Sequence, residues 1–301
     1  NSCDNGAISF TVGENDDGKL LKVFLKITCG VSTRTFTKLK KIPLGITRKG
    51  QLIKADEKVF AGDEIVLKQV SEDNNIIPVK GSLDIVYEDS HIIIINKPAS
   101  TPVHPTKIHQ GNTLANFLRY YSLEKGEDYT FRAVNRLDKD TSGLVLIAKD
   151  RHSAGILQKQ DIYKEYIAVC NGITPEKGTI DKPIKKSENS TMLRIISDDG
   201  DRAVTHFERM DCFDNSSLVK LWLETGRTHQ IRCHMSSIGH PLEGDDLYGG
   251  SLEKIERQAL HCAKMKFFHP IDGKVMELCC DIPEDMKKII NTMNLYEINI
   301  E

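Results

Sequence analysis

A polar loop at residues 134–144 carries an arginine and an aspartate two positions apart, Arg136 and Asp138. The loop leads into the apolar run Leu144–Ala148, which predicts a buried strand. Catalytic groups are often found on loops that a rigid strand holds in place. An aspartate can also simply order a turn with the Thr and Ser that follow it. Asp138 alone therefore does not separate catalysis from loop structure.

A second stretch, residues 225–235, places Arg227, His229 and Arg232 after a glycine turn. A helix is predicted over residues 228–237, and these three side chains would then cluster within about a turn and a half. Cationic and dipolar groups gathered in this way need an anionic partner. That partner is either a phosphate or a catalytic carboxylate that an arginine keeps ionised.

Metal chemistry finds little support in the sequence. His229, Cys233 and His234 are close together, and a His-Cys pair follows at residues 261–262. His229 and Cys233 could share a helical face, but no HExxH or paired CxxC motif completes a zinc site. The chain also lacks a phosphate-binding glycine loop and a dinucleotide fingerprint. We expect no metal and no cofactor.

The composition is typical of a globular protein, because 39% of the 301 residues are hydrophobic and 28% are charged. This length allows one large domain or two smaller ones. No apolar run approaches the roughly 18 residues of a membrane span, and no signal sequence is evident. The 8 cysteines are scattered. These features predict a cytoplasmic protein that does not enter a membrane.

Charge is distributed unevenly along the chain. Residues 1–70 contain 12 Lys and Arg against 8 Asp and Glu, a balance of +4, although the whole chain has a net charge of -2. A small basic module joined to an acidic body indicates a surface that faces RNA or a membrane. Considered alone, the charge distribution is better explained by a solvated charged face.

The basic module should contain only short elements. The sequence predicts an amphipathic helix at residues 18–29, a helix capped by Ser32 and running to Lys41, a turn between strands at 48–51 and a strand at 62–67. The second helix carries Arg34, Lys38 and Lys41. Such a helix would lie along RNA phosphates and add affinity without reading sequence.

Residues 71–82 are predicted to link this module, residues 1–70, to a catalytic domain at 83–301. Strands are expected at residues 85–87, 91–96, 143–148, 165–169, 203–210, 218–223 and 260–267. Helices are expected at residues 112–123 with Asn112 as the cap, 152–162, 228–237 and 284–294. Regular strand-helix-strand repeats are few, so the expected class is α+β with a largely antiparallel sheet.

The two chemical stretches resemble signatures of the RluA-type pseudouridine synthase family. Residues 136–144 resemble its Arg-Leu-Asp-x-x-Thr-Ser-Gly motif, and residues 226–234 resemble its Gly-Arg-Thr-His-Gln-Ile-Arg-x-His motif. Further matches follow in the family's order at residues 96–98, 104–105, 164–169, 239–241, 244–245, 248–249 and 282–285. Asn135 stands where the family usually has His, and Ser100 stands where Gly is common.

The resemblance implies a pseudouridine synthase fold and isomerisation of uridine to pseudouridine in RNA. Asp138 matches the family's catalytic aspartate, Arg232 the arginine that pairs with it, and Tyr166 the tyrosine that stacks on the target base. Arg136 matches the arginine thought to fill the gap left by the flipped nucleotide. Arg227 and His229 are then expected to support RNA binding.

The resemblance also implies a partner. Residues 1–70 are similar to the RNA-binding module known from ribosomal small-subunit protein four, the alpha-L fold. Family members with this module imply large-subunit ribosomal RNA, free or in a pre-ribosomal particle, as the substrate. We expect a monomer.

The implied reaction suits a single carboxylate. Asp138 would either attack the sugar or remove a proton next to the anomeric carbon, and the residues leave both routes open. Glycosidases need a second carboxylate to activate water, whereas no water should enter here. Arg232 would keep Asp138 ionised and aligned. The target base must be flipped or looped out, because a base inside a helix is inaccessible.

Two other functions compete with this hypothesis. One is an RNA-binding or ribosome-assembly factor that keeps the fold without catalysis, and the intact set of Asp138, Tyr166 and Arg232 argues against it. The other is a metal-dependent nuclease or deaminase, which the missing metal motif disfavours.

Overall fold

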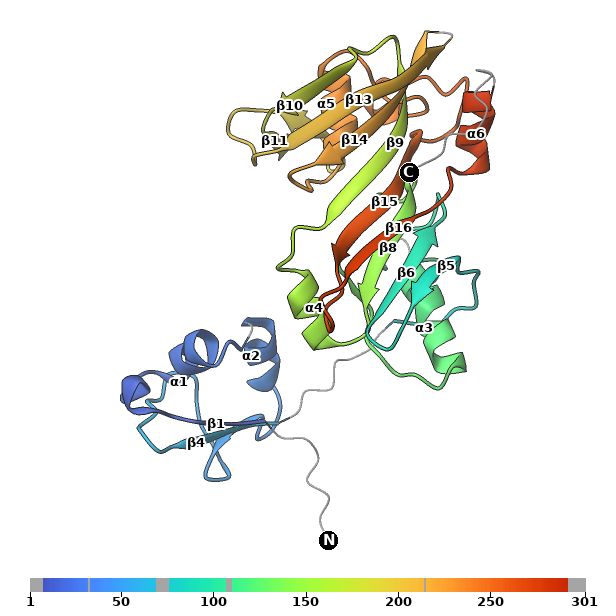
Figure 1. The fold of residues 1–301 in the computed structure, drawn as a ribbon. Coiled ribbons are helices and arrows are strands. Elements are labelled where there is room, and N and C mark those ends of the chain that lie inside the picture. Colours follow the sequence, from blue (N-terminus) through green and yellow to red (C-terminus); the bar gives the residue numbers. More distant parts are fainter. Residues whose placement is uncertain (1–7, 32, 69–75, 107–109, 214, 292–301) are drawn as a thin grey trace. The chain divides into compact units, whose positions relative to one another are not determined.

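The chain forms two compact units, residues 1–73 and 74–301 (Figure 1). In this computed structural model the described residues are 8–31, 33–68, 76–106, 110–213 and 215–291. The predicted Ser32 cap, the Arg34 side chain and residues 71–75 of the predicted linker lie outside the described part of the structure. Residues 76–82, the second part of the predicted linker, belong to the second unit.

The first unit is a small sheet covered by short helical segments. Its antiparallel strands, in the order β1-β4-β2-β3, are β1 (Ile8–Thr11), β4 (Glu64–Leu67), β2 (Ile46–Arg48) and β3 (Gln51–Leu52). Helix α1 (Leu21–Val23) continues as a π-helical turn to Thr28, and α2 spans Thr33–Leu39. Phe24, Phe36 and Ile65 are buried between these layers. Strand β1 was not predicted, although its sequence Ile-Ser-Phe-Thr alternates between apolar and polar residues; the strand is only 4 residues long and mostly exposed.

The second unit is built on one twisted sheet in the order β10-β13-β14-β9-β15-β8-β6-β5, with β16 paired to β15 and β7 paired to β8. Its strands are β5 (Ile85–Glu88), β6 (Ile92–Lys97), β7 (Arg132–Ala133), β8 (Ser142–Ala148), β9 (Tyr163–Asn171), β10 (Lys177–Asp181), β13 (Val204–Phe213), β14 (Ser216–Leu223), β15 (Leu260–Phe268) and β16 (Val275–Cys279). A separate ribbon pairs β11 (Ile184–Lys186) with β12 (Arg194–Ile196). Of the described pairs in the large sheet, β15 with β8 is parallel and the others are antiparallel. The predicted α+β class with a largely antiparallel sheet is confirmed.

Helices cover both faces of the large sheet. They are α3 (Leu114–Glu124), α4 (Arg151–Leu157), α5 (Gln230–Ser237) and α6 (Glu284–Asn291). Alternation along β9 decides which helices meet which face, since successive side chains point to opposite sides. Tyr166 and Ala168 join the core that includes α3, α4 and α5, whereas Ile167 and Val169 join the core under α6.

Several predicted helix boundaries were wrong. Thr113, not Asn112, caps α3, because its hydroxyl accepts from the Asn116 amide while the Asn116 side chain accepts from the Thr113 amide. Helix α4 ends at Leu157, short of the predicted residue 162. Strands β10, β11, β12 and β16 were not predicted. Strand β16 alternates between exposed and half-buried residues and has no fully buried one.

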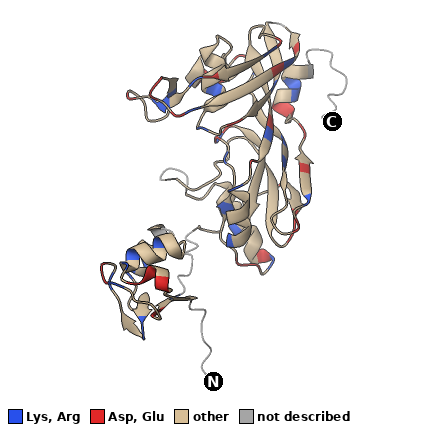
Figure 2. Cartoon of the chain, turned by 60° about the vertical axis from the view of Figure 1, so that its left-hand side comes forward, with Lys and Arg blue, Asp and Glu red and all other residues tan. Residues whose placement is uncertain are grey.

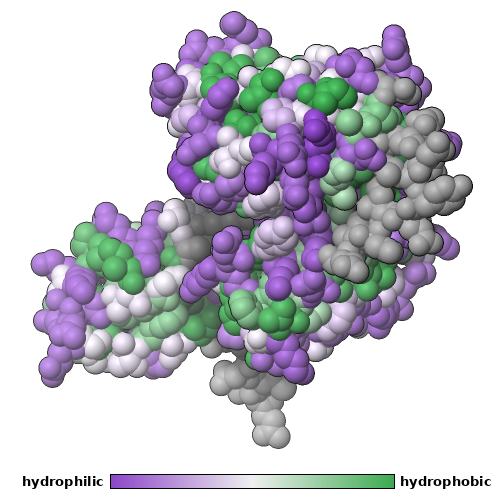
Figure 3. Space-filling model, turned by 45° about the horizontal axis from the view of Figure 1, so that its top comes forward, coloured by the Kyte–Doolittle hydropathy of each residue, from purple (hydrophilic) through white to green (hydrophobic). Residues whose placement is uncertain are grey.

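The exposed surface mixes hydrophilic and hydrophobic residues. On the face shown in Figure 3, hydrophobic residues lie in small separate patches among hydrophilic ones. Scattered apolar residues of this kind are normal on a globular surface. None of the helices in the described part of the chain has the length and apolar composition needed to cross a bilayer.

The loop after β6 gives a physical reason for glycine, the residue that the resemblance leads us to expect, at position 100. Ser100 has φ 61°, a left-handed conformation that costs a side-chain-bearing residue free energy. Ser100→Gly should raise the free energy of unfolding by about 0.5–1 kcal/mol, because the relieved strain exceeds glycine's extra freedom in the unfolded chain. Urea unfolding measures this difference. Ser82, also exposed but outside the left-handed region, is the control, and Ser82→Gly should lower stability. Equal effects at both positions would contradict the explanation.

Candidate functional site

The loop carrying Asp138 lies between β7 and β8 and is tied to β8. Asn135, the departure from the family's usual His, donates from Nδ2 to the Leu144 carbonyl at 3.1 Å and accepts the Leu146 amide at 2.8 Å. The Asn135 side chain thus binds one carbonyl and one amide of the β8 backbone and holds the start of the loop against that strand. The Thr141 amide donates to the Asp138 backbone carbonyl at 3.2 Å and closes a turn, a contact that does not use the Asp138 carboxylate.

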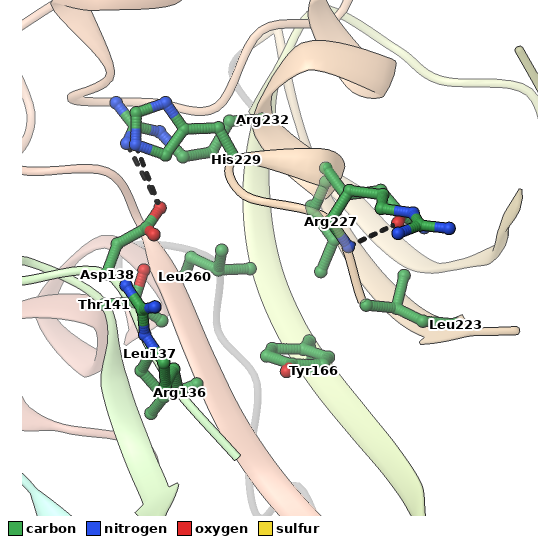
Figure 4. A pocket seen from close by; sticks show the side chains of 12 residues that line it. Arg136, Leu137, Asp138, Thr141, Tyr166, Leu223, Arg227, His229, Arg232 and Leu260 are labelled. Atoms are coloured by element: carbon green, nitrogen blue, oxygen red, sulfur yellow. Dashed lines mark hydrogen bonds and ion pairs between the residues drawn. The ribbon is translucent and has the colours of Figure 1, made fainter. Parts of the chain in front are cut away.

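Arg232 joins two carboxylates. From the buried face of α5, its Nη1 donates to Asp138 Oδ2 at 3.2 Å, as Figure 4 shows. Its Nε and Nη2 bind both oxygens of the buried Asp245 at 2.6 and 2.7 Å. Burial opposes the charge on Arg232, but the hydrogen bonds and charge of Asp245 outweigh it and raise the arginine pKa above its usual value. The guanidinium also lies 5.0 Å from the centre of the Tyr248 ring.

His229 faces the same carboxylate from the residue before α5. Its Nε2 lies 3.7 Å from Asp138 Oδ2, and its Nδ1 lies 3.1 Å from the Tyr248 hydroxyl. That hydroxyl also accepts the Arg194 amide at 2.9 Å, so Tyr248 connects His229 to the backbone at Arg194. Burial lowers the pKa of His229 and outweighs the nearby charge of Asp138, which raises it.

Arg227 does not join this cluster, which corrects the predicted grouping of three side chains on one helix. His229 has a left-handed backbone with φ 55°, and α5 begins only at Gln230. Arg227 is therefore directed elsewhere and donates from Nε to the Arg202 carbonyl at 3.1 Å. Figure 4 shows it apart from Asp138, although it lines the same pocket.

Tyr166 and Arg136 both line this pocket, but Tyr166 is buried and Arg136 is exposed. Tyr166, on β9, is only 6% exposed and belongs to the core while its ring reaches the pocket. Burial raises the pKa of its hydroxyl well above the usual value, so the hydroxyl stays protonated. Arg136 is exposed on the Asp138 loop. The structure thus brings the four residues implied by the family resemblance to one pocket.

Three buried residues around this pocket received no role from the sequence. They are Asp245 and Tyr248, described above, and the fully buried Lys97 at the end of β6. Lys97 Nζ donates to the Pro98 and Lys139 carbonyls at 2.8 and 2.9 Å. Burial lowers the pKa of Lys97 to about 7. All three lie in stretches that match the family in sequence, and this match could have marked them as site residues.

A second hollow of about 260 Å³ adjoins the pocket. Leu223 lines both, while Asn135 and Gly226 of the second hollow directly precede Arg136 and Arg227 of the first. Within the described residues, no group of three or more His, Cys, Asp or Glu is arranged to hold a metal ion. The site therefore consists of one partly exposed carboxylate, its arginine and histidine neighbours, and an aromatic ring.

Comparison with known proteins identifies the family. Residues 91–237 match the family model described as RNA pseudouridylate synthase. The uncharacterized RNA pseudouridine synthase YhcT of Bacillus subtilis is 39% identical over 300 residues, covering 95% of this chain and 97% of the relative. The chain belongs to the RluA-type family of RNA pseudouridine synthases. It is accordingly an isomerase that converts uridine to pseudouridine in RNA.

Other relatives agree with this assignment. Ribosomal large subunit pseudouridine synthase D of Escherichia coli K12 is 39% identical over 259 residues, covering 80% of this chain and 79% of the relative. The solved structures of human RNA pseudouridylate synthase domain containing 1 and 4 match with TM-scores of 0.56 and 0.58. At 24% and 23% identity they cover 72% and 71% of this chain and 98% and 94% of their own, which shows a shared fold. The predicted family and catalytic fold are confirmed.

Asp245 should be needed to hold Arg232. Asp245→Asn leaves a buried arginine without its main counter-charge, so the free energy of unfolding should fall by about 3 kcal/mol. Urea unfolding checks this value. Asp246→Asn is the matched control, since Asp246 is exposed, and its effect should stay within about 0.5 kcal/mol. Similar losses in the two variants would show that Asp245 does not hold Arg232 in this way.

Proposed function

We propose that Asp138 carries out the glycosidic rearrangement on a uridine flipped out of structured RNA. The observation that carries this proposal is the division of Arg232 between two carboxylates. Because Asp245 takes two of its donors, Asp138 receives one hydrogen bond from the arginine and remains 27% exposed at the pocket. A carboxylate that is oriented but not fully paired can still reach the ribose, either as a nucleophile or as a base.

The contacts of Asp138 support the same proposal. His229 Nε2 lies 3.7 Å from Asp138 Oδ2, and Arg232 Nη1 donates to the same oxygen at 3.2 Å, so both side chains help to orient the carboxylate. One carboxylate is sufficient because no water has to be activated. We propose that the chemistry needs no metal or other cofactor.

Tyr166 and Arg136 suit the handling of a flipped base. In our proposal the Tyr166 ring contacts the uracil, because a buried, rigid ring at a pocket wall offers a fixed apolar surface. Arg136 is exposed on the same loop as Asp138, where it can occupy the space that the flipped nucleotide leaves in the RNA. Unstacking costs a few kcal/mol, which such an insertion partly offsets.

We further propose that the RNA is large-subunit ribosomal RNA, free or in a pre-ribosomal particle. The similarity to proteins named ribosomal large subunit pseudouridine synthase D supports this choice. The hollow next to the pocket offers room for a nucleotide beside the target, with Arg227 at its border. A monomeric, cytoplasmic enzyme is the form in which we propose that it acts.

The first unit is proposed to bind RNA phosphates as an alpha-L module. Figure 2 shows Lys and Arg residues on its helices. Lys38 is half-buried on α2, and Lys41 is exposed just beyond the end of that helix. Lysines at and near a helix can add affinity through phosphate contacts, without choosing a sequence. This role complements the pocket, which acts on one base.

Asp138→Asn should abolish pseudouridine formation on transcribed large-subunit ribosomal RNA while RNA binding is retained, because the amide has no charge to act on the ribose. Mass-spectrometric detection of pseudouridine, with a filter-binding assay, measures both. Asp198→Asn, at an exposed position, should behave as wild type. Conversion by Asp138→Asn at the wild-type rate would refute the assignment. Loss of wild-type activity in excess chelator would refute cofactor independence.

Replacing both Lys38 and Lys41 with Gln should weaken RNA binding and reduce the slope of log affinity against log salt by about 1–2. Titrations at several salt concentrations give this slope. The control replaces Lys54 and Lys58, two exposed lysines of the same unit, with Gln. If the control changes the slope as much, the surface near α2 is not the phosphate-binding surface.

A further inference from the structure

The Asp138 loop, defined as residues 138–142, is held from below at each of the four positions after Asp138. Lys97, Arg257, Gln258 and His261 make these contacts. Lys97 Nζ donates to the Lys139 carbonyl at 2.9 Å, Arg257 Nη1 to the Asp140 carbonyl at 3.1 Å, Gln258 Nε2 to Thr141 Oγ1 at 3.2 Å, and His261 Nδ1 lies 2.9 Å from Ser142 Oγ. Three of these four anchors come from the five residues 257–261.

Arg257 is itself fixed by the C-terminal helix. Its Nε and Nη2 bind both oxygens of Asp285, in the first turn of α6, at 2.6 and 2.8 Å. Asp285 also accepts the Met286 amide at 2.8 Å, which orients the carboxylate on the helix. A two-point fork of this kind sets the plane of a guanidinium. The remaining nitrogen of Arg257, Nη1, donates to the Asp140 carbonyl at 3.1 Å and also to the carbonyls of Gln258 and Leu260 at 3.1 and 3.5 Å.

Helix α6, which carries Asp285, is held in place by its buried side chains. Met286, Ile289 and Ile290 are buried against β9, β14 and β15 on the sheet face opposite the core of α3, α4 and α5. The chain of contacts thus runs from a helix on one face of the sheet, through Arg257, to the loop that carries Asp138. Since Arg232 gives Asp138 one hydrogen bond, the backbone of the loop must supply the rest of its orientation.

We propose that Asp285 is a positioning residue that fixes Asp138 through Arg257 and the Asp140 carbonyl. The inference rests on the proposed role of Asp138. Without the fork, Arg257 loses its fixed plane, and the Asp138 carboxylate moves relative to the ribose. Small misplacements of a reacting group cost rate rather than RNA affinity, because the RNA-contacting surface is unchanged.

Asp285→Asn in the full chain should lower kcat for pseudouridine formation about tenfold with KM unchanged. Arg257→Lys, which keeps the charge but loses the fork, should act in the same direction, and Asp285→Glu should restore part of the rate. Glu284→Gln removes a charge from the same helical turn, where Glu284 pairs with Lys287, and should leave kcat unchanged. Equal kcat in Asp285→Asn and Glu284→Gln would overturn the proposal, as would a rise in KM without a fall in kcat.

A measurement without substrate separates this proposal from the proposed function. Hydrogen exchange at the backbone amides of residues 139–143 should become faster in Asp285→Asn than in Glu284→Gln, while the amides of α3 stay unchanged. Faster exchange only at α6, or throughout the second unit, would show a structural role and overturn the positioning role. An inactive wild-type protein would count against the proposed function, whereas the exchange result would still decide the contact chain.

Discussion

The organisation of the site depends on one arginine shared between two carboxylates. Arg232 is buried on α5, and a buried cation is stable only if its charge and donors are met. Asp245 meets most of that requirement, with two short hydrogen bonds. Asp138 receives the remaining donor and keeps part of its surface at the pocket. A stable ion pair and an available carboxylate are therefore parts of the same arrangement.

The surrounding fold keeps this arrangement in place from two sides. Above it, Tyr248 lies against the Arg232 guanidinium and binds His229. Below it, the fully buried Lys97 binds the Lys139 carbonyl, although burial lowers its pKa to about 7 and so opposes its charge. Burial of the Lys97 amine costs solvation free energy, and the hydrogen bond to the Lys139 carbonyl fixes the loop in return. The second unit thus gives up some stability to define one short loop.

Sequence reasoning succeeded where a local pattern had a single physical meaning. The apolar runs of β6 and β8 predicted buried strands, and the ordered motifs predicted the family that the comparisons show. It failed where the local conformation of one residue decides the outcome. Thr113 caps α3 in place of its neighbour, and the left-handed His229 delays α5 and separates Arg227 from Arg232. Backbone conformation at a single residue is not encoded in the apolar spacing.

The sequence by itself determined the family, the α+β class and the residues gathered at the pocket, because motif order and apolar periodicity are properties of the chain read in one dimension. Only the tertiary structure decided how those residues share their contacts. Asp138 and Arg232 are 94 positions apart, and Arg257 reaches Asp140 across 117. Hydrogen bonds act over about 3 Å, so packing of the sheet and α6 must first bring such residues together. The division of Arg232 between Asp138 and Asp245 is a result of that packing.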